Sequence, residues 1–320
     1  MRVHSIGMCN LYGIQGMSMS RNASAAIKKE EVGDADILIY SIQLPLLKAA
    51  VQYKKQYKKS RIILIVPDLL EDISNPNSAA TKVKTALLGD FAQLCQSVDA
   101  YVLLTEQMME RMPVKRPYCV VEGIYNPAER RDAGNAQSDV FTVFYSGMLY
   151  ERFGVKNLID ALGYLNMPDL RLQLCGSGDL EDYIREKAAT DPRIEYLGIV
   201  PRDRALQLQC NASLLVNPRQ PNGGFTRYSF PSKNIEYLAS GVPALLYELE
   251  GIPQEYFNYC YHLPADRCGA EELAKEIAEI YHAPAPERME LAKRAQAFIA
   301  TRKNAAVQCA KIVELMDGLQ

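Results

Sequence analysis

Short apolar runs alternate with helical patterns along most of this chain of 320 residues. In the first part, the runs that resemble strands are 37–40, 61–66, 100–104 and 118–121, with helical patterns between them at 44–57 and 79–95. In the second part, the corresponding runs are 140–145, 170–175, 194–197, 213–216 and 244–247, with helical patterns at 156–164, 180–189 and 202–209. Strands that alternate with helices pair in parallel, because each helix carries the chain back to the end of the sheet where the next strand begins. The sequence therefore predicts an α/β protein with two parallel-sheet domains.

A polar segment that contains glycine and proline, 122–139, separates the two series. Such a composition is typical of a link between domains. We therefore expect one domain at 1–128 and a second at 129–300. The tail of the chain, at 271–281 and 287–315, has the spacing of amphipathic helices.

Composition excludes several classes of protein. With 48% hydrophobic and 23% charged residues, the chain has the composition of a soluble globular protein. No apolar run reaches the roughly 18 residues that a membrane span needs, and the first residues do not resemble a signal peptide. The eight cysteines include no C-x-x-C pair, which favours buried free thiols in a reducing compartment over disulfides or zinc ligands. We expect a cytoplasmic protein without a nucleic-acid partner.

The stretch 225–247 carries the clearest sign of a binding site. It reads as a loop, a short helix and a strand, in which Pro231 can occupy the first helical turn and Gly241 ends the helix. The N–H groups at a helix start carry about half a positive charge, so a phosphate placed there is stabilised. Three donor side chains stand near this start: Ser229, Ser232 and Lys233.

The charge pattern around this helix indicates an anion. No Asp or Glu occurs between Arg204 and Ile235, whereas the same stretch holds four cations: Arg204, Arg219, Arg227 and Lys233. A segment that admits one sign of charge suits a dianionic ligand. The alternative is an ordinary capped helix with solvated Arg and Lys side chains.

Loops with glycine or proline follow the strands of the second series. They contain Gly147, the turn Gly176-Ser177-Gly178, Gly198, and Asn217-Pro218-Arg219. Ligands of open parallel sheets bind beyond the carboxyl ends of the strands, so we expect these loops and the helix start to face one crevice. A G-x-G turn is weak evidence by itself, because it is more often a tight turn than a nucleotide loop.

The stretch 225–247 resembles the donor-site helix of the group 1, or family 4, retaining glycosyltransferases of the GT-B fold. Five residues fall in register with the motif of those enzymes: Phe230, Glu236, Ala239, Gly241 and Pro243. The pieces YSFPSK and EYLASG resemble the variant found in bacterial exopolysaccharide and capsule glycosyltransferases. The resemblance implies that Glu236 bonds the ribose hydroxyls of a nucleotide sugar. The family's first Glu, which usually bonds the donor sugar, falls on Tyr228.

The two positions that bind the diphosphate in the family are altered in this chain. The segment YSGMLYERFG resembles the one that usually carries an Arg and a Lys for the diphosphate, but Met148 and Phe153 occupy those two positions. Four other cations can take their place: Arg152, Arg219, Arg227 and Lys233. The stretch after Gly198 resembles the one in which backbone groups hold the base.

The resemblance implies retaining transfer of a hexosyl group from a nucleotide-diphosphate sugar to a saccharide or lipid-linked saccharide in surface polysaccharide synthesis. It implies no metal and no cofactor besides this donor. The expected catalytic residues are Lys233, Arg227 and Tyr228. The expected donor-binding residues are Gly147, Arg152, Gly176, Gly178, Gly198, Arg219, Ser229, Phe230, Pro231, Ser232, Asn234 and Glu236.

The resemblance is looser over the first 125 residues. The N-terminal domain is expected to bind the acceptor, with Asp68 on the acceptor side. It is shorter than is usual in the family, which indicates either a compact variant or an incomplete domain that has lost its first units. The C-terminal helix at 301–320 is expected to pack back towards this domain.

Two other functions stay open. The tyrosine at position 228 and the short N-terminal part also suit a nucleotide-sugar-binding module without catalysis. A third interpretation is a GT-B epimerase that acts on a nucleotide sugar without an acceptor.

A basic helix end marks the first part of the chain, where four lysines accompany Tyr53 and Tyr57: Lys54, Lys55, Lys58 and Lys59. It is either a solvated helix end, since cations favour helix C-termini, or a patch that rests on anionic lipid. The second alternative places the protein peripherally on the inner face of the membrane.

Overall fold

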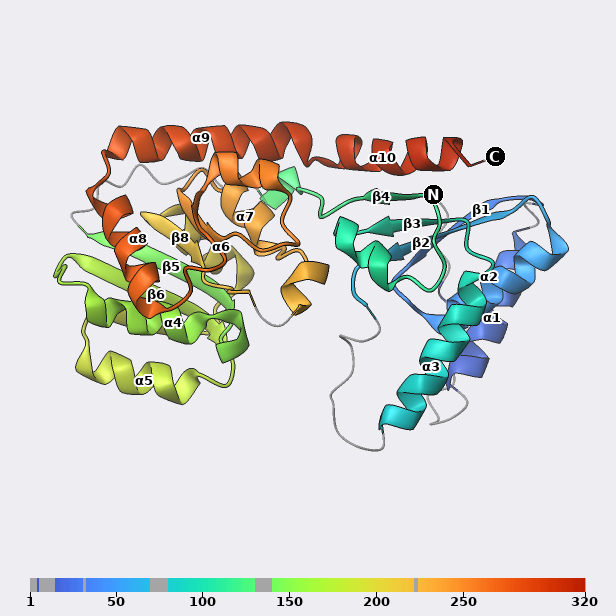
Figure 1. Cartoon of the computed structure of the whole chain (residues 1–320), viewed down its shortest axis with the longest axis horizontal. Coiled ribbons are helices and arrows are strands. Elements are labelled where there is room, and N and C mark those ends of the chain that lie inside the picture. The colour runs from blue at the N-terminus through green and yellow to red at the C-terminus, as the bar shows by residue number, and fades with distance from the viewer. Residues whose placement is uncertain are drawn as a thin grey trace. The chain divides into compact units, whose positions relative to one another are not determined.

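The computed structural model describes residues 5, 15–30, 33–69, 80–129, 140–221 and 224–319. The chain divides into two compact units, here called unit 1 (Met1–Glu122 with Cys309–Gln320) and unit 2 (Gly123–Gln308). Each unit has one parallel β-sheet with helices packed beside it (Figure 1).

Unit 1 contains four parallel strands in the order β1-β2-β3-β4. The strands are β1 (Asp36–Tyr40), β2 (Arg61–Val66), β3 (Ala100–Leu103) and β4 (Tyr118–Val120). Its first three helices, which gather beside the sheet in Figure 1, are α1 (Gln15–Lys29), α2 (Leu44–Gln56) and α3 (Ala80–Cys95). The strands are rich in β-branched and aliphatic residues, and β3 is buried along its whole length.

The last helix is α10 (Ala305–Asp317), and its part from Cys309 onward belongs to unit 1. Apolar side chains near the end of the chain pack against the buried residues Ile63, Ala100, Val102 and Val121 of unit 1. They include Ile312, Leu315, Met316 and Leu319. The Arg61 guanidinium donates hydrogen bonds to the carbonyl oxygens of Met316 (2.5 Å) and Leu319 (3.0 Å).

The helical tail is broken at Lys303, although its sequence predicts helix from 287 to 315. The helix before the break is α9 (Ala285–Arg302). Lys303 is buried, and its Nζ lies 2.6 Å from a carboxylate oxygen of Glu255. The Asn304 side chain then accepts a hydrogen bond from the Val307 N–H, as a helix cap does. The Asn304 cap therefore begins a new helix after the break at Lys303.

Unit 2 contains six parallel strands in the order β10-β9-β8-β5-β6-β7. They are β5 (Phe141–Met148), β6 (Leu170–Ser177), β7 (Ile194–Gly198), β8 (Leu214–Asn217), β9 (Ala244–Tyr247) and β10 (Tyr261–Leu263). The other helices are α4 (Val155–Ala161), α5 (Glu181–Thr190), α6 (Arg202–Cys210), α7 (Lys233–Ala239) and α8 (Ala270–His282). The winding reverses between β5 and β8, and in such sheets the ligand crevice opens at the carboxyl ends of these two strands.

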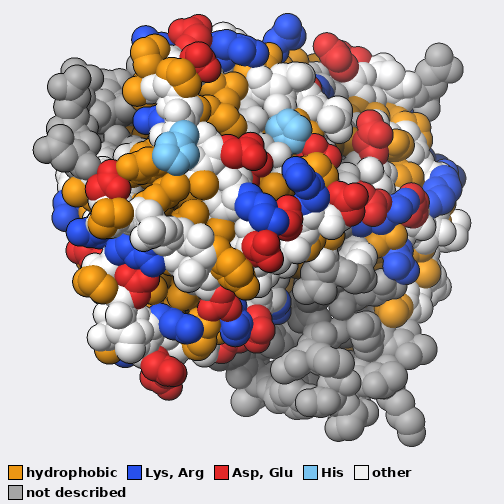
Figure 2. All heavy atoms as spheres, turned by 60° about the vertical axis from the view of Figure 1, so that its left-hand side comes forward, with side chains coloured by type: hydrophobic (Ala, Val, Ile, Leu, Met, Phe, Trp, Pro, Cys, Tyr) orange, Lys and Arg blue, Asp and Glu red, His pale blue; other side chains and the backbone are white. Residues whose placement is uncertain are grey.

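The helices of unit 2 form a layer on each side of the sheet (Figure 1). Helix α4 packs against α8 in one layer, and α7 packs against α9 in the other. Figure 2 shows cationic and anionic side chains interspersed over the face that it draws.

The predicted α/β class with two parallel sheets is confirmed. Strands 61–66 and 244–247 have the predicted bounds, whereas β5 runs three residues beyond the predicted 145. Among the α-helices and strands of the described residues, α1 and β10 were not predicted. Helix α1 is polar on average, and β10 has only three residues.

Three further observations concern only the described residues. None of their helices is long and apolar enough to cross a membrane. They hold no group of three or more His, Cys, Asp and Glu side chains placed for a metal ion. Their seven cysteines are free.

Candidate active site

The site begins where β5 and β6 end side by side. Gly147 and Gly176 are partners in the parallel register of these strands. A methyl group on Gly176 would place its carbon 1.8 Å from the Gly147 carbonyl oxygen, and Gly176 also has a φ of +132°. One on Gly178 would lie 2.3 Å from the Leu149 carbonyl oxygen. Both positions need glycine because the backbones approach so closely.

Lys233 lies against the end of β5. A methyl carbon on Gly147 would be 3.1 Å from the Lys233 Cε and 3.1 Å from the Tyr145 hydroxyl oxygen. The lysine stem therefore covers Gly147, and its ammonium group stands at the carboxyl end of the sheet. Helix α7 starts at Lys233, with Ser232 as its N-cap. The sequence-based placement of Pro231 in the first turn is corrected, since Pro231 precedes the cap.

Glu236 is held between two cations. One carboxylate oxygen lies 3.3 Å from Lys233 Nζ, and the other lies 3.2 Å from Arg202 Nη2. Sequence reasoning missed Arg202. Its signal is its position, since it is the first residue of α6, directly after the loop that leaves β7 at the same edge of the sheet.

A pocket of about 230 Å³ opens between these elements. It is lined by Ser146, Gly147, Cys175, Gly176, Ile199, Val200, Arg202, Ala205, Leu206, Lys233 and Glu236. The pocket therefore gathers the ends of β5 and β6, the loop after β7, and residues of α6 and α7. Gly198, the last residue of β7, has a φ of +65° and turns the chain into the pocket residues Ile199 and Val200.

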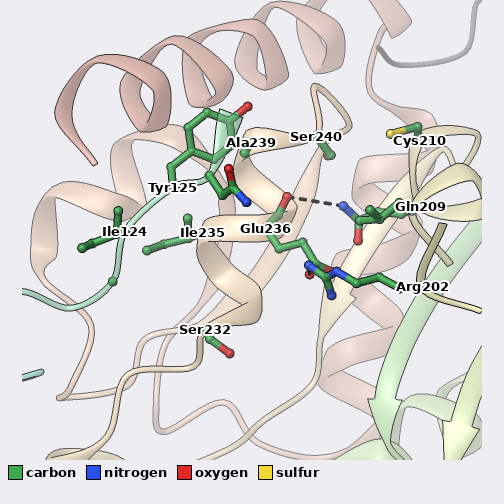
Figure 3. A pocket seen from close by; sticks show the side chains of 13 residues that line it. Ile124, Tyr125, Arg202, Gln209, Cys210, Ser232, Ile235, Glu236, Ala239 and Ser240 are labelled. Atoms are coloured by element: carbon green, nitrogen blue, oxygen red, sulfur yellow. Dashed lines mark hydrogen bonds and ion pairs between the residues drawn. The ribbon is translucent and has the colours of Figure 1, made fainter. Parts of the chain in front are cut away.

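A second pocket, of about 300 Å³, adjoins the first (Figure 3). It lies between α6, α7 and the segment 123–126, and it shares Arg202, Leu206 and Glu236 with the first pocket. In Figure 3, Arg202 and Gln209 extend from α6 towards Glu236 on α7. The Gln209 side chain donates a hydrogen bond to the Glu236 carbonyl oxygen (3.3 Å).

Two expected donor-binding side chains are buried. Asn234 has no exposed surface, and its side-chain oxygen accepts a hydrogen bond from Asn217 at the end of β8 (2.7 Å). Phe230 is 6% exposed and packs on the Tyr256 ring. These two residues hold the chain on either side of the start of α7 in the core, so a donor contact at either would be through the backbone.

The buried hydroxyl of Tyr237 also fixes α7. It accepts a hydrogen bond from the Ser146 N–H of β5 (3.3 Å). Burial raises the pKa of Tyr237 well above its ordinary value, so this side chain is a neutral structural link.

The other expected site residues fall into separate groups. Arg219 donates a hydrogen bond to the Ser229 hydroxyl (2.9 Å), and Arg152 lies near Arg219. Arg227 pairs with Glu250 (2.9 Å) and lies 5.9 Å from the centre of the neighbouring Tyr228 ring. Asp68 is exposed after β2 in unit 1.

Residues 127–298 match the model of the family described as glycosyl transferases group 1. The chain belongs to this family. The match covers more than half of the chain, including every strand of unit 2 and the whole of the pocket at Lys233. No curated protein sequence matches the chain.

Solved structures of GT-B glycosyltransferases share the fold. Anabaena HepE in complex with UDP has a TM-score of 0.68 at 16% identity, covering 98% of this chain and 85% of HepE. Sucrose-phosphate synthase from Thermosynechococcus elongatus has a TM-score of 0.69 at 16% identity, covering 99% and 85%. A glycosyltransferase from Rickettsia africae has a TM-score of 0.72 at 13% identity, covering 99% and 84%. The predicted GT-B fold is confirmed.

Proposed function

We propose that this glycosyltransferase transfers a hexosyl group, with retention, from a UDP-linked sugar to a saccharide acceptor. The observation that carries the proposal is the meeting of Lys233, Glu236 and Gly147 around one pocket at the carboxyl ends of β5 and β6. A cation and a carboxylate at neighbouring positions suit the two ends of a nucleoside diphosphate. HepE, a structural neighbour, is described in complex with UDP, which agrees with this donor.

In this proposal each side of the pocket takes one part of the donor. Glu236 accepts hydrogen bonds from the ribose hydroxyls, and the loop at Ile199–Val200 lies beside the base. The diphosphate lies at Lys233, with the Ser232 hydroxyl next to it. When a ligand hydroxyl takes one oxygen of Glu236, the Lys233 ammonium turns from the carboxylate to the phosphate.

Lys233 then acts on the leaving group. Cleavage of the anomeric bond leaves negative charge on the β-phosphate, and a cation already in place stabilises that charge without reorganisation. This proposal assigns no nucleophile to the protein. Transfer therefore depends on the donors that surround the leaving group.

The test is turnover by the purified protein. We expect it to release UDP from a UDP-hexose, faster with a saccharide acceptor, and to form a product with the anomeric configuration of the donor in NMR spectra. UDP binding in calorimetry without any turnover would instead indicate a binding module, which Tyr228 in place of the family's first Glu favours. Conversion of the donor to an epimer without an acceptor would overturn the transfer reaction.

We further propose that the acceptor is a lipid-linked saccharide of a surface polysaccharide and that unit 1 rests on anionic lipid. The structure corrects the extent of the basic patch. Lys54 pairs with Asp99 (2.5 Å), and the Tyr53 side chain is buried, so these two residues serve the core of unit 1.

Three exposed lysines remain at the end of α2: Lys55, Lys58 and Lys59. The Ser24 hydroxyl of α1 bonds the Gln52 side chain of α2 (3.3 Å), and Gly16 lies beside Pro45, so the two helices run parallel. The exposed lysines Lys28 and Lys29 at the end of α1 therefore belong to the same basic surface as those at the end of α2.

Replacing Lys55, Lys58 and Lys59 by Gln should weaken binding to vesicles that contain phosphatidylserine by about 100-fold, since each lysine near an anionic surface contributes on the order of 1 kcal/mol. The measurement is co-sedimentation with vesicles of graded phosphatidylserine content. The matched control replaces Lys275, Lys293 and Arg294 of unit 2 by Gln. Equal binding of both triple variants would count against this surface.

A further inference from the structure

Unit 1 has a groove of about 750 Å³ that is lined by its first three helices. Helix α2 packs against both α1 and α3 there (Figure 1). Helix α1 lines the groove with one face, since the lining residues recur at the spacing of a helical turn: Met17, Ser20, Arg21, Ser24 and Lys28. The groove shares no described residue with the pockets at Glu236, so it is separate from the candidate active site.

The two helices that form most of this groove carry one sign of charge. Neither α1 nor α2 contains an Asp or Glu, whereas each has three cationic residues. Three of these cations line the groove: Arg21, Lys28 and Lys48. No carboxylate of the described residues forms an ion pair with Arg21 or Lys28. A surface of one sign attracts ligands of the opposite sign, so the groove suits an anion.

Lys48 is the cation of the groove that has a partner. Its Nζ lies 2.7 Å from a carboxylate oxygen of Asp90, the only carboxylate among the described residues that line the groove. The side chains of Lys48 and Asp90 are 47% and 49% exposed. Water therefore screens this ion pair, and it opens at little cost. An anion that enters the groove competes with Asp90 for Lys48.

Hydroxyl and amide groups lie beside these cations. Helices α1 and α2 run parallel, and the Ser24 hydroxyl donates a hydrogen bond to the side-chain oxygen of Gln52 (3.3 Å). One turn earlier in each helix stand Ser20 and Lys48, which therefore lie at the same level of the groove. The bond at the Gln52 oxygen leaves the amide nitrogen of this side chain to donate to another acceptor.

The groove opens on a surface that suits a membrane. Helix α1 exposes the side chain of Met17 (66%) together with Arg21 and Lys28. Apolar and cationic side chains on one exposed helix are typical of helices that lie in a membrane interface. Lys28 lines the groove and also belongs to the basic surface at the ends of α1 and α2. The groove is therefore continuous with the surface that we place on anionic lipid.

We propose that this groove binds the phosphate of one membrane phospholipid between Arg21 and Lys48, while α1 and α2 lie along the membrane. The inference rests on the proposed contact of unit 1 with anionic lipid, to which it adds a site of defined stoichiometry. Arg21 and Lys48 donate charge-assisted hydrogen bonds to the phosphate oxygens, and the Ser20 hydroxyl adds a neutral one. The exposed Met17 side chain lies against the acyl chains.

The experiment is a calorimetric titration with dihexanoyl phosphatidylglycerol below its critical micelle concentration. We expect one lipid to bind per protein chain. Arg21→Gln should weaken this binding by about 10-fold, as for a lost charge-assisted hydrogen bond. Asp90→Asn should strengthen it by about threefold, because Lys48 loses the carboxylate that competes with the phosphate. A merely structural pair would give no gain in affinity when Asp90 is changed.

Two controls accompany these variants. Arg185→Gln removes another exposed arginine of a helix, in α5 of unit 2, and should leave lipid binding within about twofold of wild type. Glycerol phosphate, which carries the phosphate without acyl chains, should bind at least 10-fold more weakly than the lipid. The Tm of Arg21→Gln should equal that of wild type, since Arg21 is exposed.

Unchanged lipid binding in Arg21→Gln and Asp90→Asn would overturn the groove and leave the basic surface standing, provided that the wild-type protein binds phosphatidylserine vesicles. Equal affinity for glycerol phosphate and the lipid would indicate a site for soluble phosphate esters and would also overturn the proposal. Failure of the wild-type protein to bind both the vesicles and the short-chain lipid would remove the contact with lipid and the groove with it. Transfer from a UDP-hexose to a soluble saccharide is measured separately, so its failure is distinguishable from all of these results.

Discussion

Lys233→Ala is expected to lower kcat/KM for a UDP-sugar by about 100- to 1,000-fold, the range seen when one preorganised donor to a developing oxyanion is removed. The physical reason is the place of the ammonium group, against Gly147 at the end of β5. Most of the loss should appear in kcat, because leaving-group charge is greatest in the transition state. Steady-state kinetics with saturating acceptor measure both constants.

The folded structure should tolerate this change. The side chain of Lys233 is 28% exposed, and water screens its ion pair with Glu236. The free energy of unfolding should therefore change little. Lys275→Ala is the matched control, since Lys275 pairs with Glu271 and Glu272 on α8, outside the pocket. Wild-type kcat in Lys233→Ala would contradict the assignment of the leaving-group site.

Gly176→Ala is expected to destabilise unit 2 by about 2–4 kcal/mol, because it adds overpacking to a backbone conformation that alanine disfavours. The added carbon would lie 1.8 Å from the Gly147 carbonyl oxygen, so two backbones must separate. The same movement shifts Gly147 under Lys233 and should weaken UDP binding. Urea denaturation followed by fluorescence or circular dichroism measures the first effect, and calorimetry measures the second.

Two other glycines distinguish the cost of overpacking from the cost of the backbone conformation. Gly163→Ala meets no atom within 4 Å and has no positive φ, so it should be neutral. Gly198→Ala also meets no atom within 4 Å, but its φ is +65°, so it should show the backbone cost alone. If Gly176→Ala unfolds at the same urea concentration as Gly163→Ala, the close approach of β5 and β6 is not what requires this glycine.

Much of the site could be predicted because its parts are local in the sequence. The loop, helix and strand at 225–247 have a turn signal at each end, and the helix spacing places Lys233 and Glu236 within one turn. Glycines directly after strands mark the carboxyl edge of a parallel sheet wherever they occur. Gly147, Gly176 and Gly198 follow that rule.

What the sequence could not predict are contacts between residues far apart along the chain. Arg202 reaches Glu236 only because α6 and α7 pack on the same side of the sheet. Asn234 and Phe230 are polar and aromatic residues of a binding motif, yet the fold buries both. Lys54 belongs to a basic run, but it forms an ion pair with Asp99, which lies 45 positions later in the chain.

By itself, the sequence determined the two parallel sheets, the helix that follows Ser232 and the family resemblance, since periodicity and turn residues act over a few positions. The tertiary structure alone decided which cations are free for a ligand. Arg227 and Lys54 are paired with carboxylates, whereas Arg219 and Arg152 lie near the Phe153 ring and form no ion pair with a carboxylate in the part of the chain that the structure describes. Charge pairing depends on distance in space, and only the packed sheet and its loops set that distance.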